Sequence, residues 1–189
     1  MGVSVLKFIQ INIYKGMYLD DLTRFLKDQD PDIISMQEVT AHELNLCDKN
    51  LDLFEYFKKE LGLNGVVDKI TKPTDAKDSY LGNAVFSRFE ITSSEVMALK
   101  TFEGITLAKI DIVENFPLFS RHLLSAECTV YGRKVHAISW HAAWTAPPTD
   151  TEETLRQAKE VAGFLKNLNE PFILGCDMNA VPQSKTVGL

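Results

Sequence analysis

The first forty residues change hydrophobic period twice, which predicts a strand, a helix and a second strand. Residues 3–13 are apolar on both faces, as expected of a central strand covered from both sides. Residues 19–26 repeat their apolar positions at helical spacing, and Pro31 closes that helix because proline cannot continue it. Residues 32–39 form another apolar run that ends in polar side chains. We therefore expect a strand–helix–strand unit at the start of the chain.

The remaining pattern predicts two more helices and several strands. One helix is expected over residues 51–61, ended by Gly62, and another after the capping-box spacing of residues 149–152. Strand-like runs occupy residues 66–67, 83–87, 91–99, 122–130, 134–140 and 171–176, and the runs on either side of residues 131–133 form a hairpin. No repeat or interdomain linker interrupts the pattern, so we expect one domain over residues 1–189.

Composition and charge narrow the class of protein. The formal net charge is −6 and no basic block is present, so tight nonspecific DNA binding is not expected. A phosphate ester substrate remains open, because a bound divalent cation supplies positive charge. The three cysteines have no CxxC spacing, and no apolar run is long enough to span a membrane. We expect a soluble cytoplasmic protein without an obligate protein partner.

Polar residues gather where the predicted strands end. Asn12 lies near the end of the first strand, Glu38 ends the second, His141 follows the hairpin, and Asp177 and Asn179 follow the last. Strand ends on one edge of a layered fold converge in space, so these side chains can share a pocket. Oxygen ligands of this kind suit Mg²⁺, or Mn²⁺, rather than zinc.

Four motifs in this order resemble the endonuclease/exonuclease/phosphatase family. They are Gln37-Glu38 after an apolar strand, Gly82-Asn83-Ala84-Val85-Phe86-Ser87-Arg88, Trp140-His141, and Gly175-Cys176-Asp177-Met178-Asn179-Ala180. The resemblance implies an α+β fold, a four-layer α/β/β/α sandwich of the DNase I-like type. It also implies a metal-dependent hydrolase of phosphodiesters or phosphomonoesters that acts by in-line attack of water on phosphorus.

The resemblance assigns roles to these residues. Glu38 would ligate Mg²⁺, and Asn12 would help to position the metal or a phosphate oxygen. Asp177 would orient or deprotonate the attacking water. Asn179 and His141 would donate hydrogen bonds to the nonbridging phosphate oxygens as negative charge builds on them.

Four further residues are candidate substrate contacts: Asn83, Arg121, Trp140 and Trp144. Arg121 could reach a phosphate, although an arginine at a loop–strand junction is more often a solvated surface group. Packing in the core or at its rim is as good an interpretation of the two tryptophans as stacking on a ligand.

Substrates within the family range from nucleic acids to inositol phosphates and sphingomyelin. Residues 71–80 and 101–120 are the expected specificity segments, and neither carries a basic cluster that would favour a duplex. The resemblance alone favours a nuclease-type phosphodiester. The alternative is a noncatalytic module that binds phosphate esters or another partner.

Family members continue beyond the Asp-x-Asn motif into further strands and an Asp-His pair, whereas this sequence ends at Leu189. We therefore expect a sandwich and an active site that are incomplete at the carboxyl end. Missing strands would expose apolar faces and unpaired edges, so we expect this polypeptide to be marginally stable or prone to aggregate. A sharp cooperative melt of a monomer would contradict this expectation.

Overall fold

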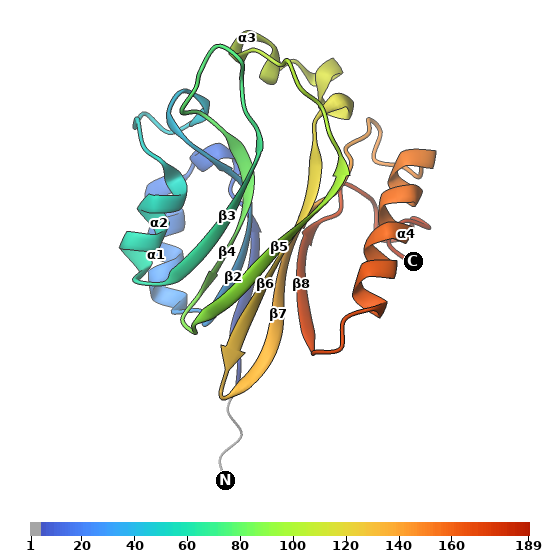
Figure 1. The fold of residues 1–189 in the computed structure, drawn as a ribbon. Helices are drawn as coiled ribbons and strands as arrows, with labels where there is room; N and C mark the ends of the chain where they lie inside the picture. Colours follow the sequence, from blue (N-terminus) through green and yellow to red (C-terminus); the bar gives the residue numbers. More distant parts are fainter. Residues whose placement is uncertain (1–4) are drawn as a thin grey trace.

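Two four-stranded β-sheets stack face to face in the computed structural model, which describes residues 5–189. The strand orders are β1-β2-β4-β3 in the first sheet and β5-β6-β7-β8 in the second. Helices α1 (Leu19–Gln29) and α2 (Leu53–Leu61) cover the outside of the first sheet, and α4 (Glu152–Lys166) covers the second (Figure 1). The described residues thus form the α/β/β/α sandwich that the family resemblance implies.

The opening strand–helix–strand unit is present. Strand β1 (Phe8–Asn12) pairs in parallel with β2 (Ile33–Thr40), and α1 connects them. Residues 3 and 4 of the expected run lie outside the described residues. Within the described residues β1 is an outer strand of its sheet, so the expectation of a central strand was wrong. Apolar side chains on both faces indicate that other layers cover the strand above and below. They do not indicate that a hydrogen-bonded strand lies on each side of it.

The other strands fall close to the predicted runs. Their bounds are β3 (Asn64–Thr71), β4 (Leu81–Ser87), β5 (Ile91–Lys100), β6 (Arg121–Val130), β7 (Arg133–His141) and β8 (Phe172–Asp177). The segment between β5 and β6 holds the short helices α3 (Leu107–Ile110) and η3 (Val113–Leu118). Two further 3₁₀ turns are η1 (Tyr14–Gly16) and η2 (His42–Leu44). None of the helices in residues 5–189 has the length and apolar character needed to cross a membrane.

Two helix ends show how the local sequence fixes the elements. Gly62 adopts a left-handed conformation (φ 64°) directly after α2, as a glycine stop predicts. The capping box before α4 is displaced by two residues from its predicted place. Thr151, not Thr149, is the N-cap: its hydroxyl accepts from the Thr154 N–H while the Thr154 hydroxyl accepts from the Thr151 N–H. A threonine therefore takes the part that the motif usually gives to Glu or Gln.

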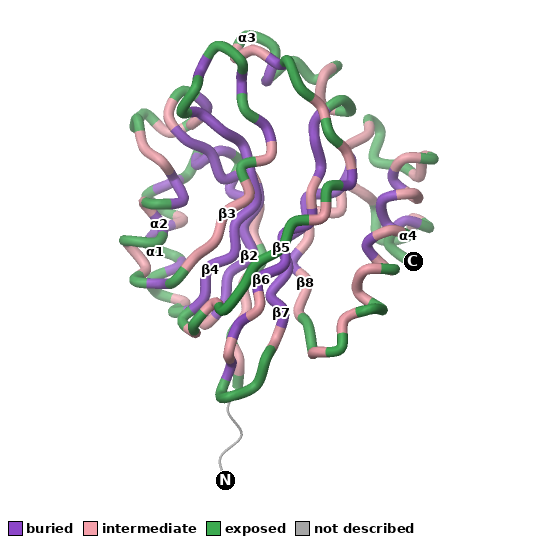
Figure 2. The backbone as a smooth tube through the Cα atoms, viewed as in Figure 1, coloured by how far each residue is buried: buried purple, intermediate pink, exposed green. Residues whose placement is uncertain are grey.

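Buried residues concentrate between the layers, as the purple segments in Figure 2 show. One apolar cluster lies between the first sheet and helices α1 and α2, a second lies between the two sheets, and a third lies beneath α4. Phe57, Leu124 and Trp140 are buried members of these three clusters in turn. The sheets are therefore docked mainly by apolar contact. Burial of apolar surface contributes a favourable free energy of roughly 25 cal/mol per Å².

Hydrogen bonds between polar groups nevertheless connect the two sheets. We call the residues that contribute these groups the polar seam: Gln10, Ser35, Gln37, Ser139 and, through its carbonyl, Gly175. The fully buried Gln37 amide donates to Ser35 Oγ and to Ser139 Oγ, both at 2.9 Å, and accepts from Gln10 Nε2 at 2.7 Å. Ser35 Oγ donates to the Gly175 carbonyl at 3.2 Å. Because buried polar groups are costly unless paired, this seam fixes the relative position of β2, β7 and β8.

Gly175 gives a direct test of that close approach. A Cβ atom there would collide with the Ser35 side chain, whereas a Cβ on Gly163, on the exposed face of α4, meets nothing within 4 Å. We expect Gly175→Ala to destabilise the fold by about 1–3 kcal/mol through overpacking. Gly163→Ala should stabilise it by about 0.5–1 kcal/mol through helix propensity. Urea unfolding of both variants measures the difference, and equal stabilities would contradict the assigned packing.

Candidate functional site

A cavity of about 560 Å³ opens at the edge of the sandwich where β1, β2, β7 and β8 end. Its lining includes all five residues predicted to carry the chemistry, namely Asn12, Glu38, His141, Asp177 and Asn179. Residues separated by up to 167 positions in the sequence thus share one pocket, which was the central geometric expectation from the strand-end pattern.

The Asn12 amide joins the two carboxylates of the cavity. Its Nδ2 donates to Glu38 Oε1 at 3.0 Å and to Asp177 Oδ2 at 2.9 Å. Its Oδ1 accepts from the Tyr14 N–H at 2.9 Å, which fixes the orientation of the amide. Asn12 therefore presents its donor end to the acids and bridges Glu38 and Asp177.

The backbone of Glu38 turns its side chain towards the cavity. Glu38 adopts a left-handed conformation (φ 56°), and the register of β2 against β4 shifts between Met36 and Val39. A non-glycine residue at positive φ costs roughly 1–3 kcal/mol, and such strain is concentrated at functional sites. Burial raises the pKa of Glu38, and hydrogen bonding from Asn12 together with the charges of Lys15 and Arg121 partly offsets that rise.

His141 and Arg121 are buried beside the acids. His141 Nε2 lies 3.9 Å from Asp177 Oδ2, and the two residues are register partners on β7 and β8. Burial, with the nearby Arg121 charge, lowers the pKa of His141 to about 3, so its imidazole is neutral near pH 7. Burial lowers the pKa of Arg121 to about 10 against the attraction of Glu38 and Asp177, so its guanidinium stays charged. The preference for a solvated Arg121 was wrong: its side chain starts β6 and points into the cavity.

Asn179 lines the cavity from the turn after β8. Its backbone is left-handed (φ 48°), its N–H donates to Asp177 Oδ1 at 3.1 Å, and its side-chain Nδ2 donates to the Ala142 carbonyl at 3.1 Å. These contacts tie the Asp-x-Asn turn to the segment after β7. The Asn179 N–H and the Asn12 amide thus donate to different oxygens of the Asp177 carboxylate.

The structure brings only some of the candidate substrate contacts to the cavity. Trp144 lines it, together with Arg121. Trp140 does not, because side chains alternate along β7: His141 faces the cavity, and Trp140 is buried against α4. Asn83 is also buried, and its amide donates to the His122 carbonyl at 3.1 Å beside a small recess next to the cavity. Trp140 is therefore a core residue of the α4 interface.

Sequence reasoning missed several cavity residues. Lys15, buried and left-handed (φ 52°), forms an ion pair with Asp111 and so links η1 to the end of α3. Phe116 and Phe119 belong to the expected specificity segment 101–120, in which the sequence pattern does not single out individual residues. Lys15 lies only three positions after Asn12 in the sequence. Hydrophobic periodicity, however, gives no sign that a side chain reaches across a pocket, so Lys15 could not be predicted.

The residues fit a cation that keeps several water ligands, such as Mg²⁺, better than a metal bound entirely by protein side chains. No group of three or more His, Cys, Asp or Glu side chains in residues 5–189 is arranged to hold a metal ion. Two carboxylates, Glu38 and Asp177, converge on one amide donor, and Mg²⁺ needs only one or two carboxylates because it keeps several waters. Glu38 is half-buried and its pKa is raised by burial, so it is the carboxylate that a cation would stabilise most.

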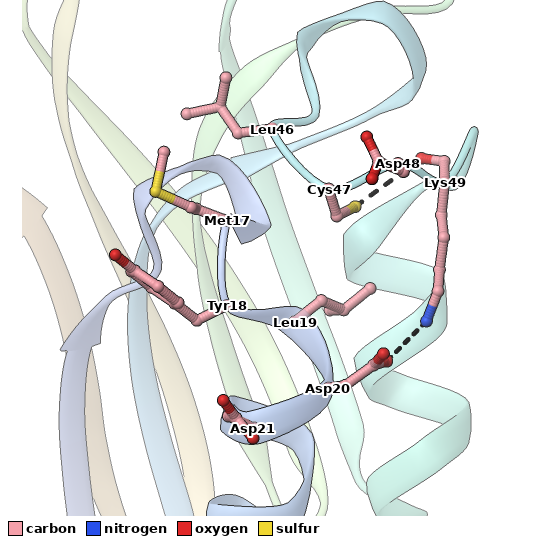
Figure 3. Close-up of a pocket in the computed structure, with 9 residues that line it drawn as sticks. All are labelled: Met17, Tyr18, Leu19, Asp20, Asp21, Leu46, Cys47, Asp48 and Lys49. Carbon is pink, nitrogen blue, oxygen red and sulfur yellow. Dashed lines mark hydrogen bonds and ion pairs between the residues drawn. The ribbon is translucent and has the colours of Figure 1, made fainter.

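A second hollow lies beside the main cavity, at the start of α1. Figure 3 shows its lining, which includes Met17 and Leu46, residues that also line the main cavity. The Lys49 ammonium reaches Asp20 at 2.5 Å across it. This hollow contains none of the predicted site residues, so we place the candidate site in the larger cavity.

Two stacked sheets covered by helices, with acids, amides and a histidine at one strand edge, place the chain in the class of DNase I-like folds. The sequence matches the Endonuclease/Exonuclease/phosphatase family over residues 9–188, and the chain belongs to that family. No curated protein matches the sequence.

Solved structures confirm the fold. The chain resembles humanized D. rerio TDP2 (18% identity, TM-score 0.66, covering 97% of this chain and 65% of that one). It resembles the human Nocturnin catalytic domain with bound sulfate (19%, 0.63, 97% and 67%). It also resembles a mannosyl-6-phosphatase of Bacteroides thetaiotaomicron (17%, 0.60, 92% and 64%). The chain thus spans about two thirds of the length of these relatives.

The lowered pKa of His141 predicts a specific dependence of stability on pH. Because the folded value is about 3 and the unfolded value near 6.5, the unfolded chain binds the extra proton between those pH values, and stability falls as pH falls through that window. We expect metal-free protein to lose up to about 2 kcal/mol more between pH 7 and pH 5 than the His141→Gln variant does. Urea unfolding at both pH values measures this, and identical losses would contradict it.

Proposed function

We propose that this protein hydrolyses a phosphate ester by in-line attack of water on phosphorus, with Mg²⁺ held at Glu38. The observation that carries the proposal is the Asn12 amide, which joins Glu38 and Asp177 at 3.0 and 2.9 Å inside one cavity. Membership of the Endonuclease/Exonuclease/phosphatase family supports the reaction class. The family's solved relatives include a phosphatase, which keeps phosphomonoesters among the substrates.

The cation and Arg121 would bind the phosphate. A bound Mg²⁺ would supply positive charge next to the nonbridging oxygens. Arg121 adds a permanent charge, because its pKa of about 10 keeps it protonated at neutral pH, and its buried side chain faces the cavity. A charge preorganised in a poorly solvated site stabilises the growing negative charge of the transition state without reorganisation.

Asp177 and His141 would act on the water and on the phosphate oxygens. Asp177 is held from two sides, since Oδ2 accepts from Asn12 and Oδ1 accepts from the Asn179 N–H. A carboxylate fixed in this way can orient the attacking water and accept its proton. His141 is neutral at the operating pH, so it donates one N–H to a nonbridging oxygen without adding charge.

Amide substitutions of the two acids test this assignment. We expect Glu38→Gln and Asp177→Asn each to lower kcat/KM by roughly 10²–10⁴-fold, since each removes a charge that acts in the transition state. The assay measures hydrolysis of bis-p-nitrophenyl phosphate and of p-nitrophenyl phosphate, once with millimolar Mg²⁺ and once with EDTA. EDTA should abolish turnover, and added Mg²⁺ should restore it.

Asp28→Asn is the matched control, because Asp28 is an exposed acid on α1 and is not among the residues that line the cavity. It should keep wild-type activity. Activity that survives both Glu38→Gln and Asp177→Asn would rule out the roles proposed for them. Tight binding of a phosphate ester without any turnover would instead favour a noncatalytic binding module.

A further inference from the structure

The cavity has two chemically different ends. The acids, His141 and Arg121 form its floor, whereas its wall is built from apolar side chains of the segment between β5 and β6 and of the turn after β7. We call Ile110, Val113, Phe116, Phe119 and Trp144 the aromatic wall. A pocket of about 560 Å³ is large enough for a small ligand, so wall and floor can contact one molecule at the same time.

Three rings of the wall are packed against each other. Phe116 lies between Phe119, with ring centroids 5.5 Å apart, and Trp144, with centroids 5.4 Å apart at an interplanar angle of 79°. Phe119 is buried, while Phe116 and Trp144 are half-buried and keep surface on the cavity. A further flat group in the cavity could contact Phe116 and Trp144 in the offset or edge-to-face arrangements that aromatic rings prefer.

The wall is a preformed feature of the fold. Ile110 and Phe119 belong to a buried cluster with Leu44, Leu81 and Ile105, which anchors the segment on the first sheet. Its two ends are joined by the Phe102 N–H, which donates to Ser120 Oγ at 2.8 Å, and Ser120 Oγ donates back to the Phe102 carbonyl at 3.1 Å. A rigid apolar surface costs little ordering entropy when a ligand binds.

The charges of the cavity do not fit a long polyanion. Its lining holds two cationic side chains, Lys15 and Arg121, against the three acids Glu38, Asp111 and Asp177, and Lys15 is already paired with Asp111. Arg121 is therefore the cation left for a ligand among these lining residues. A nucleic-acid strand that runs through a site is normally matched by several Lys or Arg contacts to its phosphates. One phosphate group beside an apolar body fits better.

From this arrangement we propose that the cavity is specific for phosphate esters that carry an aromatic group, with the phosphate on the floor and the ring against Phe116 and Trp144. This inference rests on the proposed function for the placement of the phosphate. It adds what the acids and Arg121 do not determine: the organic part of the substrate is flat and apolar. Phe116 and Trp144 are then specificity-determining residues.

Phosphonates with one charged head and different organic groups test the proposal without any turnover. Binding of phenylphosphonate, n-butylphosphonate and methylphosphonate is measured by calorimetry in the presence of Mg²⁺. We expect phenylphosphonate to bind about tenfold more tightly than methylphosphonate, with n-butylphosphonate between them. Trp144→Ala and Phe116→Ala should each remove most of the phenyl preference and leave methylphosphonate affinity within about twofold.

One control variant and one further measurement show whether the phenyl preference arises at the aromatic wall. Val96→Ala removes an exposed apolar side chain of β5 that does not line the cavity and should leave all three affinities unchanged. In Trp140→Phe, Trp144 is the remaining tryptophan of the two in the chain, so phenylphosphonate should change its fluorescence and methylphosphonate should not.

Equal affinity for the phenyl and methyl compounds, or no binding of any phosphonate, would overturn the inference. An n-butyl compound that binds as tightly as the phenyl compound would overturn the aromatic assignment. The binding measurements and the hydrolysis assay test the two proposals separately. Phosphonate selectivity without hydrolysis of either nitrophenyl ester refutes the hydrolase but supports the aromatic site, and hydrolysis without selectivity does the reverse.

Discussion

The bridge from Asn12 to Glu38 and Asp177 depends on how the two sheets are docked. Asn12 and Glu38 belong to the first sheet and Asp177 to the second, so the bridge forms only when β1, β2 and β8 are in one relative position. Apolar packing between sheets is not directional and tolerates small shifts. The polar seam removes that freedom, because a slip would leave the fully buried Gln37 amide unpaired in the core. The seam thus carries the geometric precision that the site needs.

The elements of the fold could be predicted from the sequence because their signals are local. Hydrophobic period separated helices from strands, and Gly62 marked a helix end that the structure reproduces. Where two local signals competed, prediction slipped: the S/T-x-x-E spacing at Thr149 matched the motif, but the reciprocal pair at Thr151 and Thr154 formed instead. The position of β1 in its sheet was out of reach, because burial of faces does not specify hydrogen-bonded neighbours.

The candidate site divides in the same way. Polar residues at strand ends were visible in the sequence, since such residues interrupt an otherwise apolar pattern. The burial of Arg121 was not visible, because it depends on the stacking of the second sheet on the first and on the segment 101–120, which lines the same cavity. Nor does sequence periodicity indicate that Glu38 has a left-handed backbone, a conformation stabilised by its tertiary surroundings. Nonlocal contacts determine both.

The aromatic wall and the charged floor also act on each other. Apolar side chains at the mouth of a pocket exclude water, and interactions between charges strengthen as the effective dielectric constant falls. Burial lowers the pKa of His141 and raises that of Glu38, so the histidine is neutral near pH 7 and a cation beside the acid would be favoured. A ligand ring on Phe116 and Trp144 would complete the enclosure from the open side. In the proposed function, recognition of the organic group and stabilisation of charge at phosphorus would therefore both depend on one apolar surface.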